Sequence, residues 1–499
     1  MTLKQERTPI FSGILNYIEE GTIPFHVPGH KQGRGLQELK DFVGEKVLQM
    51  DLTCFEGTDN ICNPLNEIKE AQALAAEAYG ADHAFFLVNG TTSGIQAMIM
   101  SVCQPGDKII VPRNAHKSAI GGIILSGAVP VYIQPEISED HGVALAVTSE
   151  TVAKALALHP DAKGLFIINP TYYGFTADLQ EIVRLAHSYD IPVLVDEAHG
   201  AHLPFHEDLP LSAMACGADM SATSTHKMGG SLTQSSVLFV KEGLIDPKRV
   251  KAVLNLTQTT SPSYILLASI DLARKQMFFK GHEILQRTLE LTDQLRSELS
   301  DIPGIKVIGD EMLDLPGCYS WDRTKVAINV KSLGYSGFDV ENILRKDYKI
   351  QVELADLYNV LFLLSIGDNE ETIKTLIRAL KEIAKGRYLD KVTRIGASLP
   401  ETPEQLVSPQ EAFYSETKLV SLEEAEGEIS AEMIMAYPPG IPILCPGERI
   451  TKDIIEYVRV LKNEFCHLQG PEDPHINQLK VLVRHLVLVK SAAGSGNLG

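Results

Sequence analysis

The chain has 499 residues, with 64 acidic and 45 basic side chains and a formal net charge of −19 at pH 7. This length exceeds one ordinary hydrophobic core, so two or three domains are expected. The acidic balance argues against a nucleic-acid or anionic-membrane surface and favours a cationic small molecule as ligand.

The spacing of the cysteines and the length of the apolar runs indicate the cellular compartment. No uninterrupted apolar run is long enough to span a bilayer, and Met1–Glu20 lacks the apolar core and cleavage site of a signal peptide. Seven cysteines are scattered without CxxC spacing, which favours reduced thiols over disulfides or a zinc site. We therefore expect a cytoplasmic protein with no metal.

The first fifty residues combine an amphipathic stretch, Ile10–Ile18, with an irregular one, Thr22–Gly35. Two prolines and three glycines exclude a regular helix in the second stretch. Two histidines, one of them His30, and two basic residues lie on it. The residues alone leave two interpretations open, a binding loop and a solvated linker.

A phosphate cradle is predicted near residue 90. After a predicted helix, Asn66–Tyr79, a strand and a glycine- and hydroxyl-rich turn occupy Ala84–Gly94, and an apolar helix follows from Ile95 to Cys103. The first-turn amides of such a helix are unpaired and lie at its positive dipole end. Hydroxyl residues also cap ordinary helices, but three in succession exceed that need: Thr91, Thr92 and Ser93.

Short apolar runs alternate with helical segments through the first half of the chain: Lys108–Pro112, Val129–Ile133, Leu165–Ile168 and Ile191–Val195. This alternation predicts a parallel sheet covered by helices on both faces. In such sheets ligands bind at the carboxyl ends of the strands. Polar motifs lie at those ends, in Arg113–Ser118 and Asp196–His202.

The stretch Ser221–Gln234 carries one lysine, Lys227, among hydroxyls, a histidine and glycines. Partial burial of an amine lowers its pKa and frees its lone pair for attack on a carbonyl carbon. Ser224 and His226 beside it are donors of the kind that hold a phosphate. Taken alone, such a stretch is more often a polar turn with a solvated lysine.

Further predicted elements suggest the domain plan. A long helix, Ile265–Arg287, is expected to link the large domain to a small one, in which Ile373–Lys385 is an amphipathic helix. Residues 398–430 are acidic and read as an exposed connector, and residues 491–499 as disordered. The predicted divisions are an N-terminal segment with an active-site loop (1–60), a large domain (61–287), a small domain (288–395) and a C-terminal domain (396–499).

Three motifs carry a resemblance that covers nearly the whole chain. They are Ser224-Thr-His-Lys227 with Gln234 downstream, His26-Val-Pro-Gly-His-Lys31, and Pro446-Gly-Glu448. The chain resembles the pyridoxal-phosphate decarboxylases of ornithine, lysine and arginine, most closely the short bacterial arginine decarboxylases. The resemblance implies an α/β fold of the aspartate-aminotransferase type (fold type I), with a mostly parallel sheet and smaller α+β C-terminal domains.

The resemblance also assigns roles around the cofactor. Lys227 supplies the amine that holds pyridoxal phosphate. Asp196, otherwise a possible helix cap, would keep the ring nitrogen protonated. His199 could bond the phenolic oxygen and Ala198 could pack beneath the ring, whereas His116 matches the histidine that stacks on the opposite face.

The phosphate is expected to bind the cradle, Ser224, His226 and, from a neighbouring subunit, Ser263, which implies at least a dimer. The His30 segment is also expected near the active site across that interface. The larger members' receiver-like N-terminal domain is missing, so their decameric assembly is not expected.

Substrate preference is expected to depend on acidic groups. Glu353 matches the family carboxylate that meets the distal cation, and Asp356 would add a second one unless it only begins a helix. Two carboxylates suit a guanidinium. We therefore expect arginine, converted to agmatine and CO2 for polyamine (spermidine) biosynthesis, with lysine or ornithine as alternatives. Lys227 or His226 would return the proton.

The residues also allow three rival interpretations. The residues Asp196, Glu197, His199, His202 and His206 could hold a divalent ion in a metal hydrolase, but that would leave Lys227, the cradle and His116 without roles. An aminotransferase or β-eliminase would keep the fold and change the reaction. A non-catalytic relative would have no reason to retain Lys227, Asp196 and His116 together.

Overall fold

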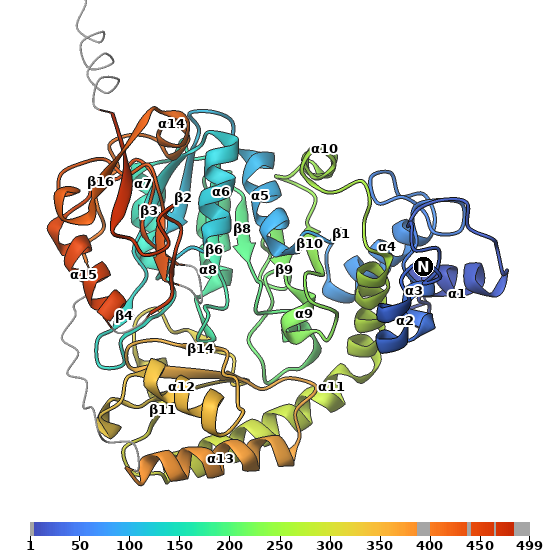
Figure 1. The fold of residues 1–499 in the computed structure, drawn as a ribbon. Helices are drawn as coiled ribbons and strands as arrows, with labels where there is room; N and C mark the ends of the chain where they lie inside the picture. The colour runs from blue at the N-terminus through green and yellow to red at the C-terminus, as the bar shows by residue number, and fades with distance from the viewer. Residues whose placement is uncertain (1–3, 387–399, 437–440, 464–465, 484–499) are drawn as a thin grey trace, which may run out of the picture.

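The computed structural model describes residues 4–386, 400–436, 441–463 and 466–483 (Figure 1). A large domain occupies the centre of Figure 1, with the small domain below it, the C-terminal domain to the left and the N-terminal helices to the right. The predicted disordered stretch 491–499 lies outside the described residues. No helix within the described ranges is both long and apolar enough to cross a membrane.

The large domain is built on a seven-stranded sheet, and the prediction of a mostly parallel sheet is confirmed. In spatial order the strands are β1 (His83–Leu87), β10 (Ser236–Val240), β9 (Met220–Thr223), β8 (Val193–Asp196), β6 (Gly164–Ile168), β2 (Lys108–Pro112) and β3 (Val129–Ile133). Strand β10 runs antiparallel to both of its neighbours, whereas the pairs from β9 to β3 are parallel.

Helices bury both faces of this sheet because strand side chains alternate between them. In β8, Val193 and Val195 enter one core and Leu194 enters the other. The first core includes α1 (Pro9–Glu19), α4 (Glu67–Tyr79), α7 (Ser149–Leu158) and α8 (Leu179–His187). The second includes α5 (Gly90–Val102), α6 (Lys117–Ser126) and α10 (Pro247–Thr257).

The linking helix α11 is longer than the sequence predicts, since it runs from Tyr264 to Ser300. Its second half packs in the small domain against α13 (Glu370–Ala384), so the boundary expected at 287/288 falls inside one continuous helix. The small domain also has α12 (Gly337–Asp347) and an antiparallel sheet of β11 (Lys306–Ile308), β13 (Lys325–Asn329), β15 (Asn359–Leu363) and β14 (Leu354–Ala355).

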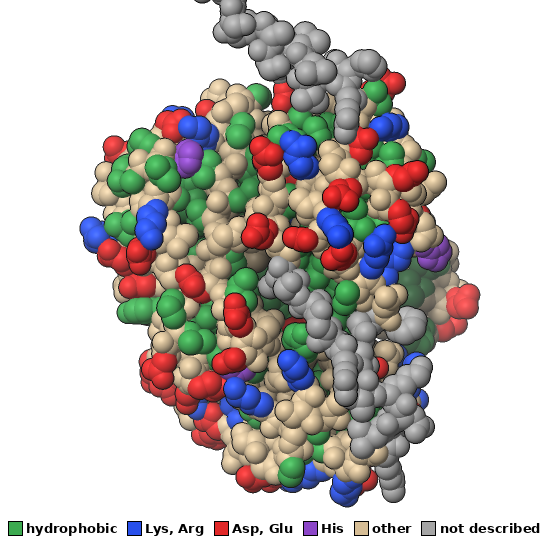
Figure 2. All heavy atoms as spheres, turned by 90° about the vertical axis from the view of Figure 1, so that its left-hand side faces the viewer, with side chains coloured by type: hydrophobic (Ala, Val, Ile, Leu, Met, Phe, Trp, Pro, Cys, Tyr) green, Lys and Arg blue, Asp and Glu red, His purple; other side chains and the backbone are tan. Residues whose placement is uncertain are grey.

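The exposed connector expected at 398–430 is part of the C-terminal domain instead, as far as the structure describes it. In its described part, 400–430, Leu422 and Ala425 are buried in the C-terminal core, because apolar residues are interspersed among the acidic ones. The domain contains α14 (Pro409–Tyr414), β16 (Thr417–Ser421), β17 (Ile434–Ala436), β18 (Ile441–Leu444), α15 (Lys452–Asn463), β19 (Leu468–Gln469) and β20 (Gln478–Leu482). Figure 2 shows acidic and basic side chains interspersed over the face of the molecule on this side.

Short elements complete the described chain. They are α2 (Gln37–Val43), α3 (Glu45–Gln49), β4 (Ile137–Ser138), β5 (Val143–Ala144), β7 (Phe175–Thr176), η1 (Leu203–Phe205), α9 (Thr225–Met228), η2 (Asp310–Asp314), β12 (Ser320–Trp321), η3 (Lys331–Leu333) and η4 (Leu422–Glu424). The helical turn α9 matters most for the site, because it carries the lysine segment directly after β9.

Candidate active site

The predicted site residues follow neighbouring strands at the carboxyl edge of the sheet. Strand β8 ends at Asp196, β9 leads into α9 with Lys227, and β2 leads into the segment that carries His116. Because the carboxyl ends of parallel strands meet at one edge, Asp196, Lys227 and His116 converge there with their neighbours as one strand-end group. The rule for strand ends therefore predicted that these side chains lie together.

The Lys227 amine is the centre of this group. Its Nζ lies 2.8 Å from Nε2 of His199. Burial lowers the pKa of Lys227, opposed by the negative charges of Asp196 and Glu353. Burial and the Lys227 charge hold the pKa of His199 well below its ordinary value, so its ring is neutral and accepts from the amine. The ring proton then lies on Nδ1, which is buried and has no hydrogen-bond partner in the described part of the chain.

Asp196 is a buried carboxylate with little hydrogen bonding. Among the described residues one donor reaches it, the backbone N–H of Ala198, at 3.1 Å from Oδ1. Burial raises the pKa of Asp196, opposed by the nearby charge of Lys227. A buried carboxylate in this state is poised to accept a hydrogen bond from a cationic ligand atom.

The hydroxyls of the predicted cradle have three different roles. The Thr91 hydroxyl forms hydrogen bonds with the hydroxyls of Ser224, at 2.5 Å, and Ser236, at 2.7 Å. These bonds fix the start of α5 against the lysine segment. Ser93 donates to the carbonyl of Gly90 at 2.8 Å. Thr92 is exposed at the same helix end. The N–H of Gly90, the first residue of α5, already donates to the carbonyl of Gln234 at 3.0 Å. The open donors are therefore Thr92 and the next amides of the first turn, with Thr91 and Ser224 holding them in place.

Two histidines flank Lys227. His116 caps α6 by accepting from the backbone N–H of Ser118 at 3.2 Å, and burial together with the Lys227 charge lowers the pKa of His116 to about 4. Nδ1 of His226 lies 2.8 Å from the carbonyl of Ser235. Burial lowers the pKa of His226, opposed by that carbonyl. Both rings are therefore neutral near pH 7.

The small domain brings Glu353 to the lysine. Tyr172 donates its hydroxyl to Oε1 of Glu353 at 3.0 Å. The Tyr172 ring lies 4.4 Å from the His199 ring, and its centroid is 5.5 Å from Nζ of Lys227. Tyr172 was missed in the sequence, although it follows β6 closely and the strand-end rule would have included it.

Asp356 does not face this group. It accepts from the Tyr173 hydroxyl, from the backbone N–H of Tyr358 at 2.8 Å and of Asn359 at 2.7 Å, and from the Asn359 side chain. These bonds hold the turn between β14 and β15. The expected second substrate carboxylate is therefore occupied within the protein, because the turn needs an acceptor for its buried amides.

Two expected residues lie outside the group formed by this single chain. Nε2 of His30 lies 3.0 Å from Asp51, and Nδ1 of His30 accepts from the backbone N–H of Gly33. Ser263 caps α11 by accepting from the backbone N–H of Leu266 at 3.4 Å. Their expected contacts depend on a second chain.

A buried charged cluster lies beneath the site. Oδ2 of Asp322 is 2.6 Å from Nζ of Lys325 and 3.0 Å from Nε2 of His202, and all three side chains are 0% exposed. Burial alone would raise the pKa of Asp322, but Lys325 and His202 outweigh it and hold that pKa well below its ordinary value. The Lys325 charge in turn helps to lower the pKa values of Lys227 and His199.

Asp322→Asn is expected to lower the free energy of unfolding by about 3–5 kcal/mol, because it leaves Lys325 buried without its counter-charge. Urea unfolding at pH 7 measures this loss. Since the folded state depresses the pKa of Asp322, its contribution is complete above about pH 4 and is lost as the pH falls further. Glu370→Gln, which breaks the exposed Lys374–Glu370 pair, is the control and should leave the free energy of unfolding almost unchanged, because solvent screens this pair. Equal losses for both variants would contradict the account.

The ligand set expected for a metal hydrolase is not assembled. Nε2 of His199 faces Lys227, and Nε2 of His202 faces Asp322. A cation bound by His199 and Asp196 would also have to displace the Lys227 amine. The hydrolase hypothesis therefore finds no support in the geometry of these donors.

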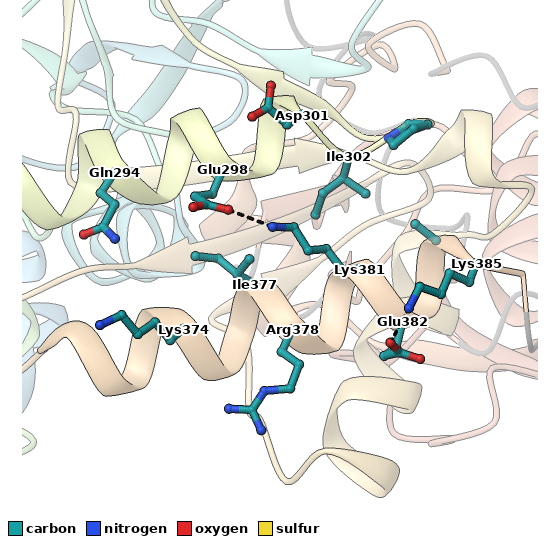
Figure 3. Close-up of a pocket in the computed structure, with 12 residues that line it drawn as sticks. Gln294, Glu298, Asp301, Ile302, Lys374, Ile377, Arg378, Lys381, Glu382 and Lys385 are labelled. Carbon is teal, nitrogen blue, oxygen red and sulfur yellow. Dashed lines mark hydrogen bonds and ion pairs between the residues drawn. The ribbon is translucent and has the colours of Figure 1, made fainter.

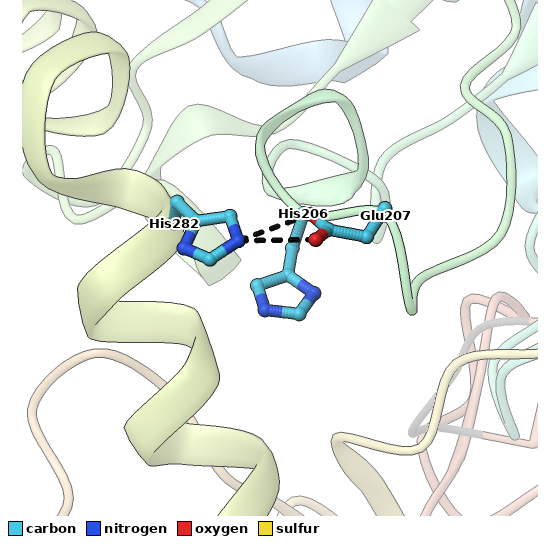
Figure 4. A group of neighbouring side chains, drawn as sticks. All are labelled: His206, Glu207 and His282. Carbon is cyan, nitrogen blue, oxygen red and sulfur yellow. Dashed lines mark hydrogen bonds and ion pairs between the residues drawn. The ribbon is translucent and has the colours of Figure 1, made fainter.

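One group of three ligand-type side chains does occur among the described residues: His206, Glu207 and His282 (Figure 4). However, Nδ1 of His206 accepts from the backbone N–H of Asp208 at 3.2 Å, which places the ring proton on Nε2, 3.0 Å from Oε1 of Gln286. Neither nitrogen of His206 then offers a lone pair to an ion. His282 and Glu207 form a simple surface pair at 3.1 Å.

A hollow of about 650 Å³ lies between α11 and α13 (Figure 3). Four of its charged side chains pair with one another, Lys381 with Glu298 at 2.7 Å and Lys385 with Glu382 at 2.6 Å. None of its lining residues belongs to the strand-end group. The chemistry therefore lies at the sheet edge and not in this hollow.

The strand-end group fits pyridoxal phosphate. This cofactor needs an amine, a carboxylate for its ring nitrogen, donors for its phosphate and a polar contact for its phenolic oxygen. Lys227, Asp196 and the α5 terminus would supply the first three, and Nδ1 of His199, which has no partner among the described residues, would supply the fourth.

Comparisons with known proteins agree with this fit. A family model for the major domain of Orn/Lys/Arg decarboxylases matches residues 8–372, and one for their C-terminal domain matches residues 394–473. An arginine decarboxylase of Bacillus anthracis is 49% identical over 483 residues, covering 96% of this chain and 98% of that protein. An arginine decarboxylase of Bacillus subtilis (strain 168) is also 49% identical, over 96% of this chain and 99% of its own.

Solved structures agree on the fold. The constitutive lysine decarboxylase of E. coli has a TM-score of 0.82 to this structure at 21% identity, covering 96% of this chain and 82% of that chain. This structural similarity confirms the expected fold, in which smaller domains follow a mostly parallel large domain. From these matches and the full-length relatives, the chain belongs to the Orn/Lys/Arg decarboxylase family.

Proposed function

We propose that this protein is a pyridoxal-phosphate-dependent decarboxylase that converts arginine to agmatine and CO2, a step that would supply polyamine biosynthesis. The observation that carries the proposal is the Tyr172–Glu353 pair beside Lys227, which sets one carboxylate near the reactive amine. The two arginine decarboxylases at 49% identity favour arginine as the substrate. Lysine and ornithine are the alternatives.

Each of these residues has a separate role in the reaction. When bound, pyridoxal phosphate takes up the electron pair that departing CO2 leaves behind. Lys227 holds the cofactor, and its lowered pKa favours the neutral amine that exchanges with the substrate. Asp196 keeps a proton on the ring nitrogen, and neutral His116 covers the ring without adding charge. Lys227 or His226 returns a proton to the α-carbon.

Glu353 is expected to bind the distal cation of the substrate. Glu353→Gln should raise KM for arginine by about 10- to 100-fold, because a charge-assisted bond contributes about 1.5–3 kcal/mol. Tyr172→Phe keeps the carboxylate but frees it to turn, and a loss of about 1 kcal/mol predicts a rise of about fivefold.

Steady-state CO2 release measures both effects, and Glu371→Gln on α13 is the control with an exposed acidic residue. Titration with the cofactor should give the same affinity in all three variants. An unchanged KM in Glu353→Gln would place substrate recognition elsewhere. The ratio of kcat/KM for arginine and lysine then identifies the substrate.

The functional unit is a homodimer with shared active sites. Large apolar side chains are exposed on the N-terminal segment of the single chain, with Phe25 at 95% and Phe42 at 89%. Exposed apolar side chains gathered in one segment favour association. A second copy covering them would also bring His30 and Ser263 toward the opposite site.

Phe25→Ser combined with Phe42→Ser is expected to shift the dimer toward monomer and to reduce activity in parallel. Sedimentation velocity at micromolar concentration measures the shift. Leu158→Ser, which changes a residue 75% exposed on α7, is the control and should leave the sedimentation unchanged. A double variant that remains dimeric and fully active would exclude this surface as the interface.

The expected compartment is the cytoplasm. All seven cysteines are free thiols in the structure, as a reducing compartment requires.

A further inference from the structure

The C-terminal domain contacts the large domain through a buried ion pair. Arg113 is the first residue after β2, and its guanidinium meets the carboxylate of Glu448 with both nitrogens, at 2.5 Å (Nη1–Oε1) and 3.0 Å (Nη2–Oε2). Nη2 also donates to the carbonyl of Ile443 at 3.2 Å. The guanidinium lies 4.9 Å from the ring centroid of Tyr132 on β3. This geometry fixes direction as well as distance, because both groups are planar and forked.

The turn formed by the Pro446-Gly-Glu448 motif places the Glu448 carboxylate beside Arg113. Gly447 has φ +87°, and a Cβ there would lie 2.0 Å from the carbonyl oxygen of Val407, so glycine is required. The turn points Glu448 inward, where its side chain is 0% exposed and accepts from the backbone N–H of Cys445 at 2.7 Å. The motif builds a contact between domains and has no contact with the strand-end group.

The ion pair lies three residues before His116. The short segment between them is held to the sheet edge, since Arg113 donates its backbone N–H to Ile133 at 2.8 Å and Ala115 to Pro112 at 3.1 Å. His116 then caps α6. At the other end of α6, the Gln410 side chain donates to the carbonyl of Ile124 at 2.9 Å, and α14 packs along the helix.

We propose that the C-terminal domain positions His116 over the cofactor, through the Glu448–Arg113 pair before α6 and through α14 beside it. Glu448 and Arg113 are positioning residues, because neither touches the strand-end group. The proposal rests on the proposed function, in which His116 covers the cofactor ring. It gives the C-terminal domain a role in the reaction itself, and it predicts that a change at Glu448 alters turnover more than substrate binding.

Two variants separate positioning from stability. Arg113→Lys keeps the positive charge but loses the second nitrogen that binds the Glu448 carboxylate. The double variant Arg113→Met with Glu448→Met replaces the ion pair by apolar side chains, an exchange that buried pairs often tolerate without loss of stability. Glu404→Gln is the control, because it breaks the exposed Arg449–Glu404 pair (3.4 Å) on the same domain.

Each holoenzyme is tested by kcat, by KM and by circular dichroism in the visible band of the bound cofactor. We expect kcat to fall by about 10- to 100-fold in both positioning variants, as a displacement of about 1 Å in a site would cause. KM should stay within twofold and the visible dichroism should change, whereas Glu404→Gln should match the parent.

Parent-like kcat and dichroism in a folded double variant would overturn the proposal, and so would a double variant that cannot fold, since the pair would then serve stability alone. A parent protein that binds no cofactor would instead overturn the proposed function.

Discussion

Lys227→Ala is expected to lower kcat by about 10⁴-fold or more, because Lys227 supplies the amine beside His199 and Asp196 at the sheet edge. Lys227 is half-buried and its side chain does not fill a core, so the fold should persist. Circular dichroism in the far ultraviolet and the melting temperature check the fold, and CO2 release from arginine measures kcat.

A small soluble amine offers a sharper check of the same position. Methylamine should restore part of the lost rate in Lys227→Ala by replacing the missing amine, and it should not help a variant that fails for another reason. Lys248→Ala, which removes an exposed lysine from α10, is the control and should keep full activity. Normal turnover by Lys227→Ala would refute the mechanism.

Asp196→Asn is expected to lower kcat by about 10²- to 10³-fold, the usual loss when one preorganised electrostatic partner is removed. Asparagine can still accept from the backbone N–H of Ala198, so the turn after β8 should be kept. It cannot hold a proton on the ring nitrogen as a carboxylate does. The cofactor ring would therefore take up the electron pair less readily.

The cofactor should still bind to Asp196→Asn, because Lys227 and the α5 terminus are unchanged. Absorbance of the holoenzyme measures occupancy, and single-turnover CO2 release measures the chemical step. A rate within twofold of the parent would remove Asp196 from this role.

The residues at strand ends could be predicted from the sequence. Apolar runs mark the strands of a parallel sheet, and the polar residues after them must meet at its carboxyl edge. This rule predicted the positions of Asp196 and the cradle, and the resemblance added the expected role of His116. Local patterns carry this information because each motif adjoins its own strand.

The remaining features depend on contacts between distant segments. Tyr172 meets Glu353 only because the small domain packs on the large one, and Arg113 meets Glu448 across two domains. No periodicity in the sequence encodes such pairs. Asp356 was misjudged for a related reason, since a carboxylate that caps a turn and one that binds a substrate have the same sequence signature.

The most direct test of the account is CO2 release by the purified protein with pyridoxal phosphate, supplied in turn with arginine, lysine and ornithine. Mass spectrometry of the amine product identifies the reaction. We predict a visible absorbance band from the bound cofactor, CO2 from arginine well above that from the other two, and agmatine as the product. A protein that binds the cofactor but releases no CO2 from any of the three would contradict the central claim.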